Sequence, residues 1–227
     1  MRIVVISLGG SLIIPDKIDF VFLDKFKKEI RKHYSECKIV VVCGGGSVAR
    51  KYMDALKKEG RPESELAEAG IMSTRMNAKF LMEFFGQEAN NVLPRDMNEV
   101  ASNLHKNKIV ICGALRYADN ETSDGTAAKL SHFLSCNFVN MTNVRGLYTA
   151  DPRIDRNAKF IDNISWVDFE KMAKKIKFKP GQHFVLDQKA AEIIRKYRIK
   201  TYIIGKDVIN MGKIIKGEKF VGTLIEK

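Results

Sequence analysis

The chain lacks the sequence features of secreted, membrane-spanning and metal-scaffolded proteins. No apolar run approaches the ~20 residues that a membrane-spanning helix needs, and the N-terminus enters an apolar segment without the regions of a signal peptide. The four cysteines have no Cys-x-x-Cys spacing, and the four histidines have no metal-ligand spacing. We therefore expect a cytoplasmic protein with reduced thiols and no resident metal site.

Two common nucleotide-binding signatures are also absent. Gly-x-Gly-x-x-Gly does not occur, which disfavours a Rossmann dinucleotide site, and the absence of Gly-x-x-x-x-Gly-Lys-Ser/Thr argues against a P-loop. The chain has no internal repeat, low-complexity tract or Pro-rich linker. Its 227 residues are 45% hydrophobic and 29% charged, which is ordinary for a folded protein. We therefore expect residues 1–227 to form a single domain.

The chain has a formal net charge of +12, an excess that could attract nucleic acid or anionic substrates. The basic residues lie mostly at helical spacing with acidic residues among them, as in residues 25–32. This pattern is typical of a solvated helix face. Aromatic residues interleaved with Arg, as in single-strand binders, are not evident. We therefore expect neither nucleic acid nor a membrane as a partner.

Two apolar segments end in glycine-rich corners. The predicted strand 3–7 leads into Gly9-Gly10-Ser11, and the strand 39–43 leads into residues 44–47 and a helix from about residue 48. Either corner alone could be a tight turn. Successive glycines let backbone N–H groups approach a ligand closely, an arrangement that suits phosphate oxygens. Because the carboxyl ends of parallel strands meet at one edge of a sheet, the two corners together predict one phosphate-binding cleft.

Hydrophobic periodicity places the other elements and predicts an α/β protein. Helices are expected over 19–34, 48 onward, 63–85, 96–105, 124–134 and 187–197. Strands are expected over 38–43, 90–93, 108–112, 138–141, 201–204 and 222–225. In the helix that begins near residue 48, the side chains expected to face inward are Val48, Tyr52, Ala55 and Leu56. Residues 142–152 favour a β-hairpin, residues 179–182 a turn, and Ser165 caps a helix.

Four polar or charged residues are candidates for phosphate chemistry. Residues 114–123 form a polar loop, and Thr122, Ser123 and Asp124 occupy N-cap positions of the helix that follows. They are either simply caps, or hydroxyls that hold a second phosphate while Asp124 organises the charge through Mg²⁺ or another cation. Arg50, close to the triple glycine, could bind phosphate with its planar donors or form a surface ion pair. Small residues in the helix 63–85 allow another helix to approach its backbone closely. This contact could lie either between subunits or within the core.

Seven segments form an ordered set along the chain, namely residues 7–11, 42–50, 70–78, 122–124, 142–152, 189–191 and 222–223. In this order they resemble the amino acid kinase superfamily and, within it, the uridylate (UMP) kinases of the archaeal type. The resemblance covers nearly the whole length. It implies a three-layer αβα sandwich with a mainly parallel central sheet, and transfer of the γ-phosphoryl group of Mg-ATP to UMP to give UDP.

The resemblance also implies roles for individual residues, with Arg50 and Asp124 as the catalytic pair. The residues implied to hold the ATP phosphates are Gly9, Gly10, Ser11, Gly46 and Arg50. Those implied to line the adenosine site are Thr142, Tyr148 and Asp151. Those implied to hold UMP are Gly44, Gly45, Thr122 and Ser123. Because related enzymes are often hexamers built from dimers, a homo-oligomer is expected.

At several positions the chain differs from the usual family pattern. Ser7 stands where many members have Lys, Ala67 where an acidic residue binds the acceptor ribose, and Arg145 where Asp is usual. The loop 114–123 also lacks a usual Pro-Gly. Two alternatives therefore remain beside UMP kinase activity. One is phosphoryl transfer to a carboxylate, carbamate or isoprenoid phosphate, and the other is a catalytically silent nucleotide- or anion-binding protein on the same fold.

Overall fold

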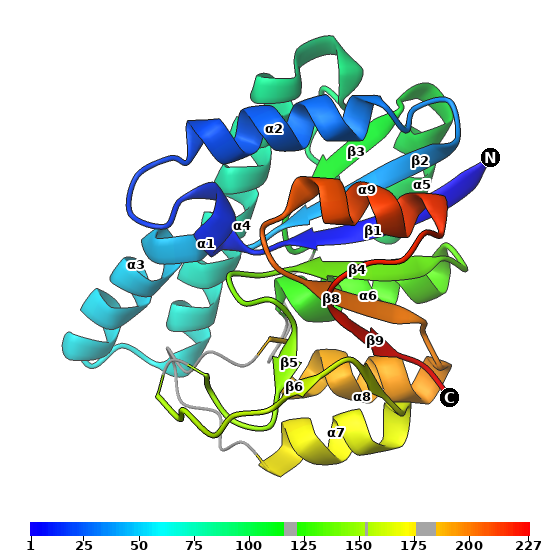
Figure 1. Ribbon diagram of the computed structural model, residues 1–227. Coiled ribbons are helices and arrows are strands. Elements are labelled where there is room, and N and C mark those ends of the chain that lie inside the picture. Colours follow the sequence, from blue (N-terminus) through cyan, green and yellow to red (C-terminus); the bar gives the residue numbers. More distant parts are fainter. Residues whose placement is uncertain (116–121, 153, 176–184) are drawn as a thin grey trace.

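The computed structural model describes residues 1–115, 122–152, 154–175 and 185–227. A seven-stranded sheet with the order β3-β2-β1-β4-β8-β9-β7 lies between two layers of helices (Figure 1). Its strands are β1 (Arg2–Leu8), β2 (Cys37–Cys43), β3 (Ile109–Cys112), β4 (Asn137–Met141), β7 (Asn163–Ile164), β8 (Thr201–Ile204) and β9 (Thr223–Ile225). A separate antiparallel pair consists of β5 (Leu147–Tyr148) and β6 (Phe160–Ile161).

The five strands β3, β2, β1, β4 and β8 are all parallel. Only β9 runs antiparallel to its neighbour β8, and β7 pairs in parallel with β9. The register aligns Leu8 with both Cys43 and Met141, so three strands end at the same level. The loops after β1, β2 and β4 therefore leave the sheet side by side. This confirms the predicted mainly parallel sheet and places both glycine corners at one edge.

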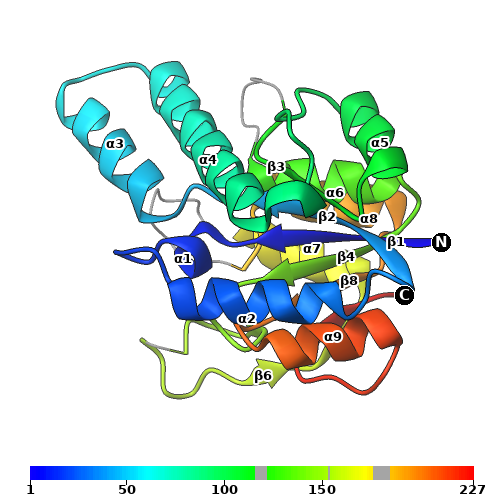
Figure 2. The same ribbon diagram turned by 90° about the horizontal axis from the view of Figure 1, so that it is seen from above.

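Helices cover both faces of the sheet, and each face has its own hydrophobic cluster (Figure 2). On one face lie α2 (Phe20–Arg31), α9 (Val208–Lys216) and the C-terminal half of α4 (Glu63–Phe85). On the other face lie α5 (Met97–Lys106), α6 (Ser123–Phe133), α7 (Trp166–Lys175) and α8 (Gln188–Tyr197). The short elements are α1 (Gly10–Ile13) and the 3₁₀ turn η1 (Gly86–Glu88). The predicted αβα sandwich is confirmed.

The helix α3 (Gly46–Lys58) and the first half of α4 extend beyond the sheet as a helical hairpin (Figures 1 and 2). The inward placement expected for Tyr52 and Ala55 is wrong, because α3 packs on α4 and both side chains are exposed, Tyr52 by 59%. A Cβ on Gly70 of α4 would lie 3.4 Å from Met53 Sδ of α3. A methyl group at position 70 would therefore be in ordinary van der Waals contact with α3.

Other predictions need correction. Residues 90–93 do not form a strand, because the buried Asn90 side chain donates to Val92 O and Ile111 O and accepts from Ile111 N. The hairpin expected within 142–152 is longer, since β5 pairs with β6. The helices α1 and α9 and the strands β6 and β7 were not predicted. The turn at 179–182 and most of the loop 114–123 lie outside the described residues.

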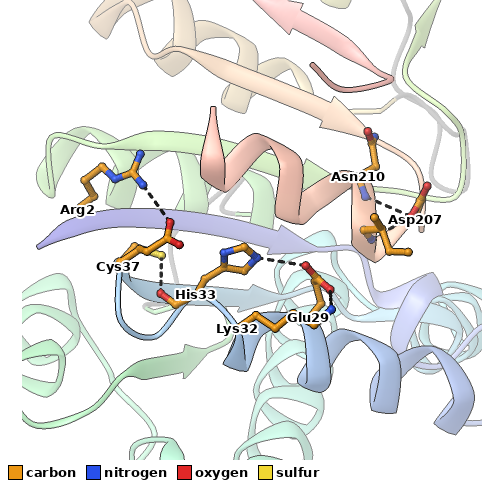
Figure 3. A network of polar contacts seen from close by, with 9 residues as sticks. Arg2, Glu29, Lys32, His33, Cys37, Asp207 and Asn210 are labelled. Carbon is orange, nitrogen blue, oxygen red and sulfur yellow. Dashed lines mark hydrogen bonds and ion pairs between the residues drawn. The ribbon is translucent and has the colours of Figure 1, made fainter. Parts of the chain in front are cut away.

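A polar group at the end of α2 packs against α9 on the first face (Figure 3). Glu29 accepts from Lys32 Nζ at 2.6 Å and lies 3.3 Å from Nε2 of the fully buried His33. Burial alone would raise the pKa of Glu29, but the hydrogen bonds from Lys32 and His33 bring it below its ordinary value. A Cβ at Gly212 of α9 would collide with the Glu29 carboxylate. Glycine at this position therefore sets how closely α9 packs on α2.

Cysteine side chains contribute to the core of this fold. Cys43 and Cys112 are fully buried at strand ends, as predicted for core residues. Burial raises the pKa of the Cys112 thiol to about 12. Of the helices in the described part of the chain, none is long and apolar enough to cross a membrane.

Candidate active site

The two glycine corners touch each other at the edge where β1 and β2 end. A Cβ added to Gly10 would lie 2.5 Å from Gly46 Cα and 2.7 Å from Gly44 C. A Cβ on Gly45 would lie 2.5 Å from the Ala49 Cβ. Gly46 has a φ of +67°, which favours glycine. The corners therefore form one continuous backbone surface, and no side chain fits between them.

Backbone hydrogen bonds divide the corner amides into two groups. Gly9 N donates to Met141 O at 3.0 Å and Gly44 N donates to Leu8 O at 2.9 Å, so these amides fix the corners to the sheet. By contrast, the N–H groups of Gly10, Ser11 and Gly46 find no acceptor among the described residues. Such amides can donate to the oxygens of an anion. We conclude that only some of the predicted glycines present donors, while the others shape the surface.

Two polar side chains of α4 bond to backbone carbonyls at the ends of β2 and β3. Asn77 Nδ2 donates to Gly44 O at 2.7 Å from a buried position. Arg75 donates from Nε to Ala114 O at 2.9 Å and from a terminal nitrogen to Leu115 O at 2.7 Å. Asn77 and Arg75 therefore tie the second corner and the chain after β3 to the same helix. Both residues lie in the helix predicted over 63–85. The hydrophobic periodicity of that helix does not indicate which carbonyl groups they bond.

Asp124 lies in the first turn of α6 and faces the end of β1. It accepts a hydrogen bond from Ser7 Oγ at 2.8 Å, which joins positions 117 residues apart. Burial of the carboxyl, together with the negative charge of Asp187, raises the pKa of Asp124 to about 7, although the Ser7 bond opposes this. No Lys or Arg of the described chain forms an ion pair with Asp124. The carboxyl is therefore poised to gain or lose a proton near neutral pH.

The helices α6 and α8 begin side by side, and their caps are hydrogen-bonded to each other. Thr122 is the N-cap of α6 and accepts from Gly125 N at 2.9 Å. Its hydroxyl donates to Asp187 Oδ2 at 2.5 Å, and Asp187 caps α8 by accepting from Ala190 N at 2.7 Å. The predicted capping role of Thr122 is confirmed. Asp187 was missed, because in the sequence it shows only the N-cap pattern of a distant helix.

Arg50 lies on the exposed side of α3, four residues after Gly46. Among the described residues it has no ion-pair partner. The alternative of a surface ion pair therefore finds no support in the described chain. The guanidinium remains available to a ligand at the corner that precedes it.

The remaining predicted site residues lie on three different segments of the chain. Thr142 directly follows β4, and its Cα would lie 3.9 Å from a Cβ on Gly9, so it borders the first corner. Tyr148 lies on β5, where its ring packs edge-on against Phe160 with centroids 5.3 Å apart. Asp151 lies beyond β5, at the turn where its carbonyl accepts from Asp155 N. Ser123 is the first residue of α6.

The described residues contain no group of three or more His, Cys, Asp or Glu side chains that could hold a metal ion by themselves. Asp124 and Asp187 are instead two carboxylates at the starts of α6 and α8, whose caps are hydrogen-bonded to each other. Such a pair suits a magnesium ion that arrives already bound to phosphates, since Mg²⁺ in phosphoryl-transfer sites is held by one or two carboxylates plus substrate oxygens. The arrangement can therefore hold anionic phosphates and a cation in one place.

Comparisons with known proteins agree with this geometry. The profile of the Amino acid kinase family matches residues 2–205. A uridylate kinase of Pyrococcus abyssi is 36% identical over 228 residues, covering 100% of both chains. The crystal structure of the uridylate kinase of Archaeoglobus fulgidus superposes with a TM-score of 0.85 at 34% identity, covering 99% of this chain and 100% of that one.

A more distant structure, the UMP kinase of Bacillus anthracis, has a TM-score of 0.81 at 20% identity over 99% of this chain and 96% of its own. At this identity the likeness supports the fold alone. The profile match and the full-length relatives above 30% identity settle the family. The chain belongs to the amino acid kinase family and, within it, to the uridylate kinases.

Proposed function

We propose that the protein transfers the γ-phosphoryl group of Mg-ATP to UMP, giving ADP and UDP, and so acts in pyrimidine nucleotide biosynthesis. The observation that carries the proposal is the contact between the glycine corners at Gly10 and Gly46, beside Asp124. Two phosphate chains must meet end to end for such a transfer. A continuous backbone surface without side chains allows both phosphate chains to bind next to each other.

The donor half is assigned to the first corner and to α3. The amides of Gly10, Ser11 and Gly46 hold the phosphates of ATP, while Gly9 keeps the surface free of a side chain. Arg50 approaches from α3 with planar donors suited to phosphate oxygens. The adenosine is assigned to the segment that starts at Thr142 and continues into the β5–β6 pair, with Tyr148 and Asp151.

The acceptor half is assigned to the second corner and to the start of α6. Gly44 and Gly45 let the UMP phosphate approach the backbone, and Thr122 and Ser123 supply hydroxyls at the beginning of a helix. A helix N-terminus favours an anion through its unpaired amides and dipole. The two phosphates thus meet where the corners touch, and Asp124 is joined to the first of the two strands through Ser7.

The chemistry follows from the charge of the acceptor. A UMP phosphate oxygen is already a nucleophile, so no strong general base is needed. Catalysis then consists of positioning and of cancelling negative charge on the transferred group. Arg50 and the free corner amides supply positive potential that is in place before the reaction. The Asp124–Ser7 hydrogen bond holds the carboxyl at the end of β1.

Magnesium enters with ATP as part of the substrate. The residues placed to attract it are Asp124 and Asp187. Burial, and then the negative charge of Asp187, raise the pKa of Asp124 when no cation is near. A cation between them favours the carboxylate form of both. The ion itself supplies charge neutralisation to the phosphates.

The protein is also proposed to be a cytoplasmic homo-oligomer, a hexamer by resemblance to related enzymes. The exposed apolar side chains of the α3–α4 hairpin support association, since Tyr52, Met72 and Met76 are 59%, 56% and 69% exposed. Large exposed apolar groups on one element often mark an interaction surface. The molar mass in solution, measured by light scattering, tests this part.

The reaction itself is tested by incubating the purified protein with Mg-ATP and UMP and separating the nucleotides. Equal amounts of ADP and UDP, dependent on both substrates, are expected. Formation of ADP without UDP would refute the proposed acceptor. No ADP, from protein that binds ATP, would favour a silent binding protein.

A further inference from the structure

The chain that follows β3 leaves the sheet beside the second glycine corner. The register aligns Val42 of β2 with Cys112 of β3, so these two strands end at the same level. Gly44 directly follows β2, and Gly113 directly follows β3. The backbone from Gly113 to Leu115 is therefore a neighbour of the corner that is assigned to the acceptor phosphate.

Three hydrogen bonds hold this backbone against one turn of α4. Arg75 donates from Nε to Ala114 O at 2.9 Å and from a terminal nitrogen to Leu115 O at 2.7 Å. Thr74 Oγ1 accepts from Ala114 N at 2.9 Å. A Cβ on Gly113 would lie 2.7 Å from Arg75 N, so the end of the strand and the helix are in direct contact. Thr74 and Arg75 thus satisfy both backbone polar groups of Ala114.

The second corner is held by the same part of α4. Asn77 is buried and donates from Nδ2 to Gly44 O at 2.7 Å. A Cβ on Gly45 would lie 3.6 Å from the Ser73 Cβ, so this corner also packs along the helix. Residues 73–77 of α4 therefore determine how the second corner and the chain after β3 lie relative to each other.

The first corner, which is assigned to ATP, is held by other elements. Gly9 N donates to Met141 O at the end of β4. Within the described ranges, no side-chain hydrogen bond joins residues 74–77 to residues 9–11. A change at Thr74 or Arg75 should therefore displace the acceptor half of the site and leave the donor half in place.

The guanidinium of Arg75 suits this task for a chemical reason. Its N–H donors lie in one plane at fixed angles, so bonds to two consecutive carbonyl groups fix the orientation of both. A lysine ammonium can replace only one of these bonds without fixing its direction. No carboxylate of the described chain forms an ion pair with Arg75. The side chain therefore serves the backbone after β3 and not a surface ion pair.

We propose that Arg75 is a positioning residue for the acceptor nucleotide. Through Ala114 and Leu115 it fixes the backbone beside Gly44, and this sets the affinity for UMP without changing the affinity for ATP. Thr74 acts with it through Ala114 N. This role, which rests on the proposed function, assigns the two substrates to parts of the site that are held in place independently.

Calorimetric titration with UMP and, separately, with a non-hydrolysable ATP analogue tests the proposal. Arg75→Met and Thr74→Val should each raise the Kd for UMP by about 10-fold, because the acceptor backbone is misplaced. Arg75→Lys should raise it by about 3-fold, since an ammonium can keep one of the two bonds. The Kd for the ATP analogue should stay within about 2-fold of the wild type in all three variants.

The matched control is Lys79→Met, one turn further along α4. Lys79 is exposed and pairs with Glu83 at 2.6 Å, so this variant removes a positive charge from the same helix without touching the chain after β3. Its Kd for UMP should equal that of the wild type. Unchanged UMP binding in Arg75→Met, or equal weakening of both nucleotides, would overturn the proposal. Weaker UMP binding in Arg75→Met but not in Thr74→Val would make Arg75 a direct phosphate ligand, which would also overturn it.

Binding separates this role from the proposed reaction. A wild type that binds both nucleotides but makes no UDP would remove the reaction, and the variants would still decide the role of Arg75. A wild type that makes UDP, with variants that bind UMP equally well, would remove the positioning role alone. Amide hydrogen exchange of residues 109–115 without nucleotide should be faster in Arg75→Met and Thr74→Val than in Lys79→Met. Equal exchange in all three variants would overturn the proposal.

Discussion

Gly10 lies so close to Gly46 that a Cβ on Gly10 would stand 2.5 Å from Gly46 Cα. The two glycines come from corners that follow different strands, and they meet because β1 and β2 are paired in register up to Leu8 and Cys43. The neighbouring atoms are backbone and cannot rotate away. The proposed transfer site therefore depends on the absence of two side chains as much as on any group present.

Gly10→Ala should lower both stability and turnover. The added methyl forces the two corners apart, at a cost of ~2–3 kcal/mol in the free energy of unfolding, in the range of overpacked sites. Displacement of the corner amides should lower kcat/KM for ATP by ~100-fold, as for the loss of an oxyanion donor. Urea unfolding and steady-state kinetics measure the two effects.

The matched control is Gly70→Ala. Its Cβ would meet only Met53 Sδ at 3.4 Å, in the interior of α4. Helix propensity then favours alanine by ~0.5–1 kcal/mol. If Gly10→Ala unfolded at the same urea concentration as the wild type and retained its activity, the contact between the corners would not be functional.

Arg50→Ala should lower turnover far more than stability. Arg50 is exposed and has no ion-pair partner in the described chain, so unfolding should change by no more than about 0.5 kcal/mol. Loss of a guanidinium aimed at the transferred phosphate should raise the barrier by ~3–5 kcal/mol, by analogy with arginine fingers. Lys51→Ala, on the next residue of the same helix, is the control and should retain activity. Parallel losses of stability and turnover in Arg50→Ala would make Arg50 structural.

Asp124→Asn should stabilise the ligand-free protein while lowering turnover. Burial and the charge of Asp187 raise the pKa of Asp124 from 3.8 to about 7. Between these pH values the folded protein holds a proton that the unfolded chain releases, so stability falls as the pH rises. Above pH 7 the penalty is complete, and its removal should stabilise the variant by up to ~4 kcal/mol, since each unit of pKa shift corresponds to about 1.4 kcal/mol. The asparagine oxygen can still accept from Ser7.

Thermal unfolding of both proteins between pH 5.5 and 8.5 tests the sign. The gain in Asp124→Asn should be larger at pH 8.5 than at pH 5.5, and turnover should fall ~100-fold because the charge that organises the cation is lost. A variant less stable than the wild type at every pH would show that Asp124 is already ionised and compensated in the folded state.

Gly212→Ala should destabilise the fold without affecting the chemistry. The new methyl would collide with the Glu29 carboxylate and lie 3.0 Å from His33 Nε2, so either the Glu29 side chain must leave its contact with His33 or α9 must move off α2. A loss of ~1–3 kcal/mol is expected from overpacking at a buried contact. Activity per folded molecule should stay within 2-fold of the wild type, because no assigned substrate residue lies between α2 and α9. A large loss of kcat with unchanged stability would connect this interface to the site.

The sequence predicts the sheet and the corners well because they depend on local patterns. Apolar runs such as residues 39–43 can hardly be anything but buried strands, and the glycines that follow them mark the ends. Helix α4 was predicted with both of its bounds, since its periodicity is long and uninterrupted. Thr122 could be predicted as an N-cap because it directly precedes a predicted helix.

The errors arise where tertiary contacts decide. Residues 90–93 have β-forming character, but the Asn90 side chain satisfies the β3 backbone in place of a strand. Tyr52 has helical spacing, yet no sheet lies beneath α3, so it is exposed. The sequence does not predict a site role for Asp187, because that role depends on the packing of α8 beside α6. Its relation to Asp124 spans 63 positions and is a property of the fold.

The most direct test of the account is the acceptor preference. ADP release from Mg-ATP is measured with UMP, CMP, AMP and GMP supplied separately, each at the same concentration. We expect clear turnover with UMP and at least 10-fold less with the other three nucleotides, with UDP as the product. Absence of turnover with UMP, in protein that binds ATP and phosphorylates a different acceptor, would contradict it.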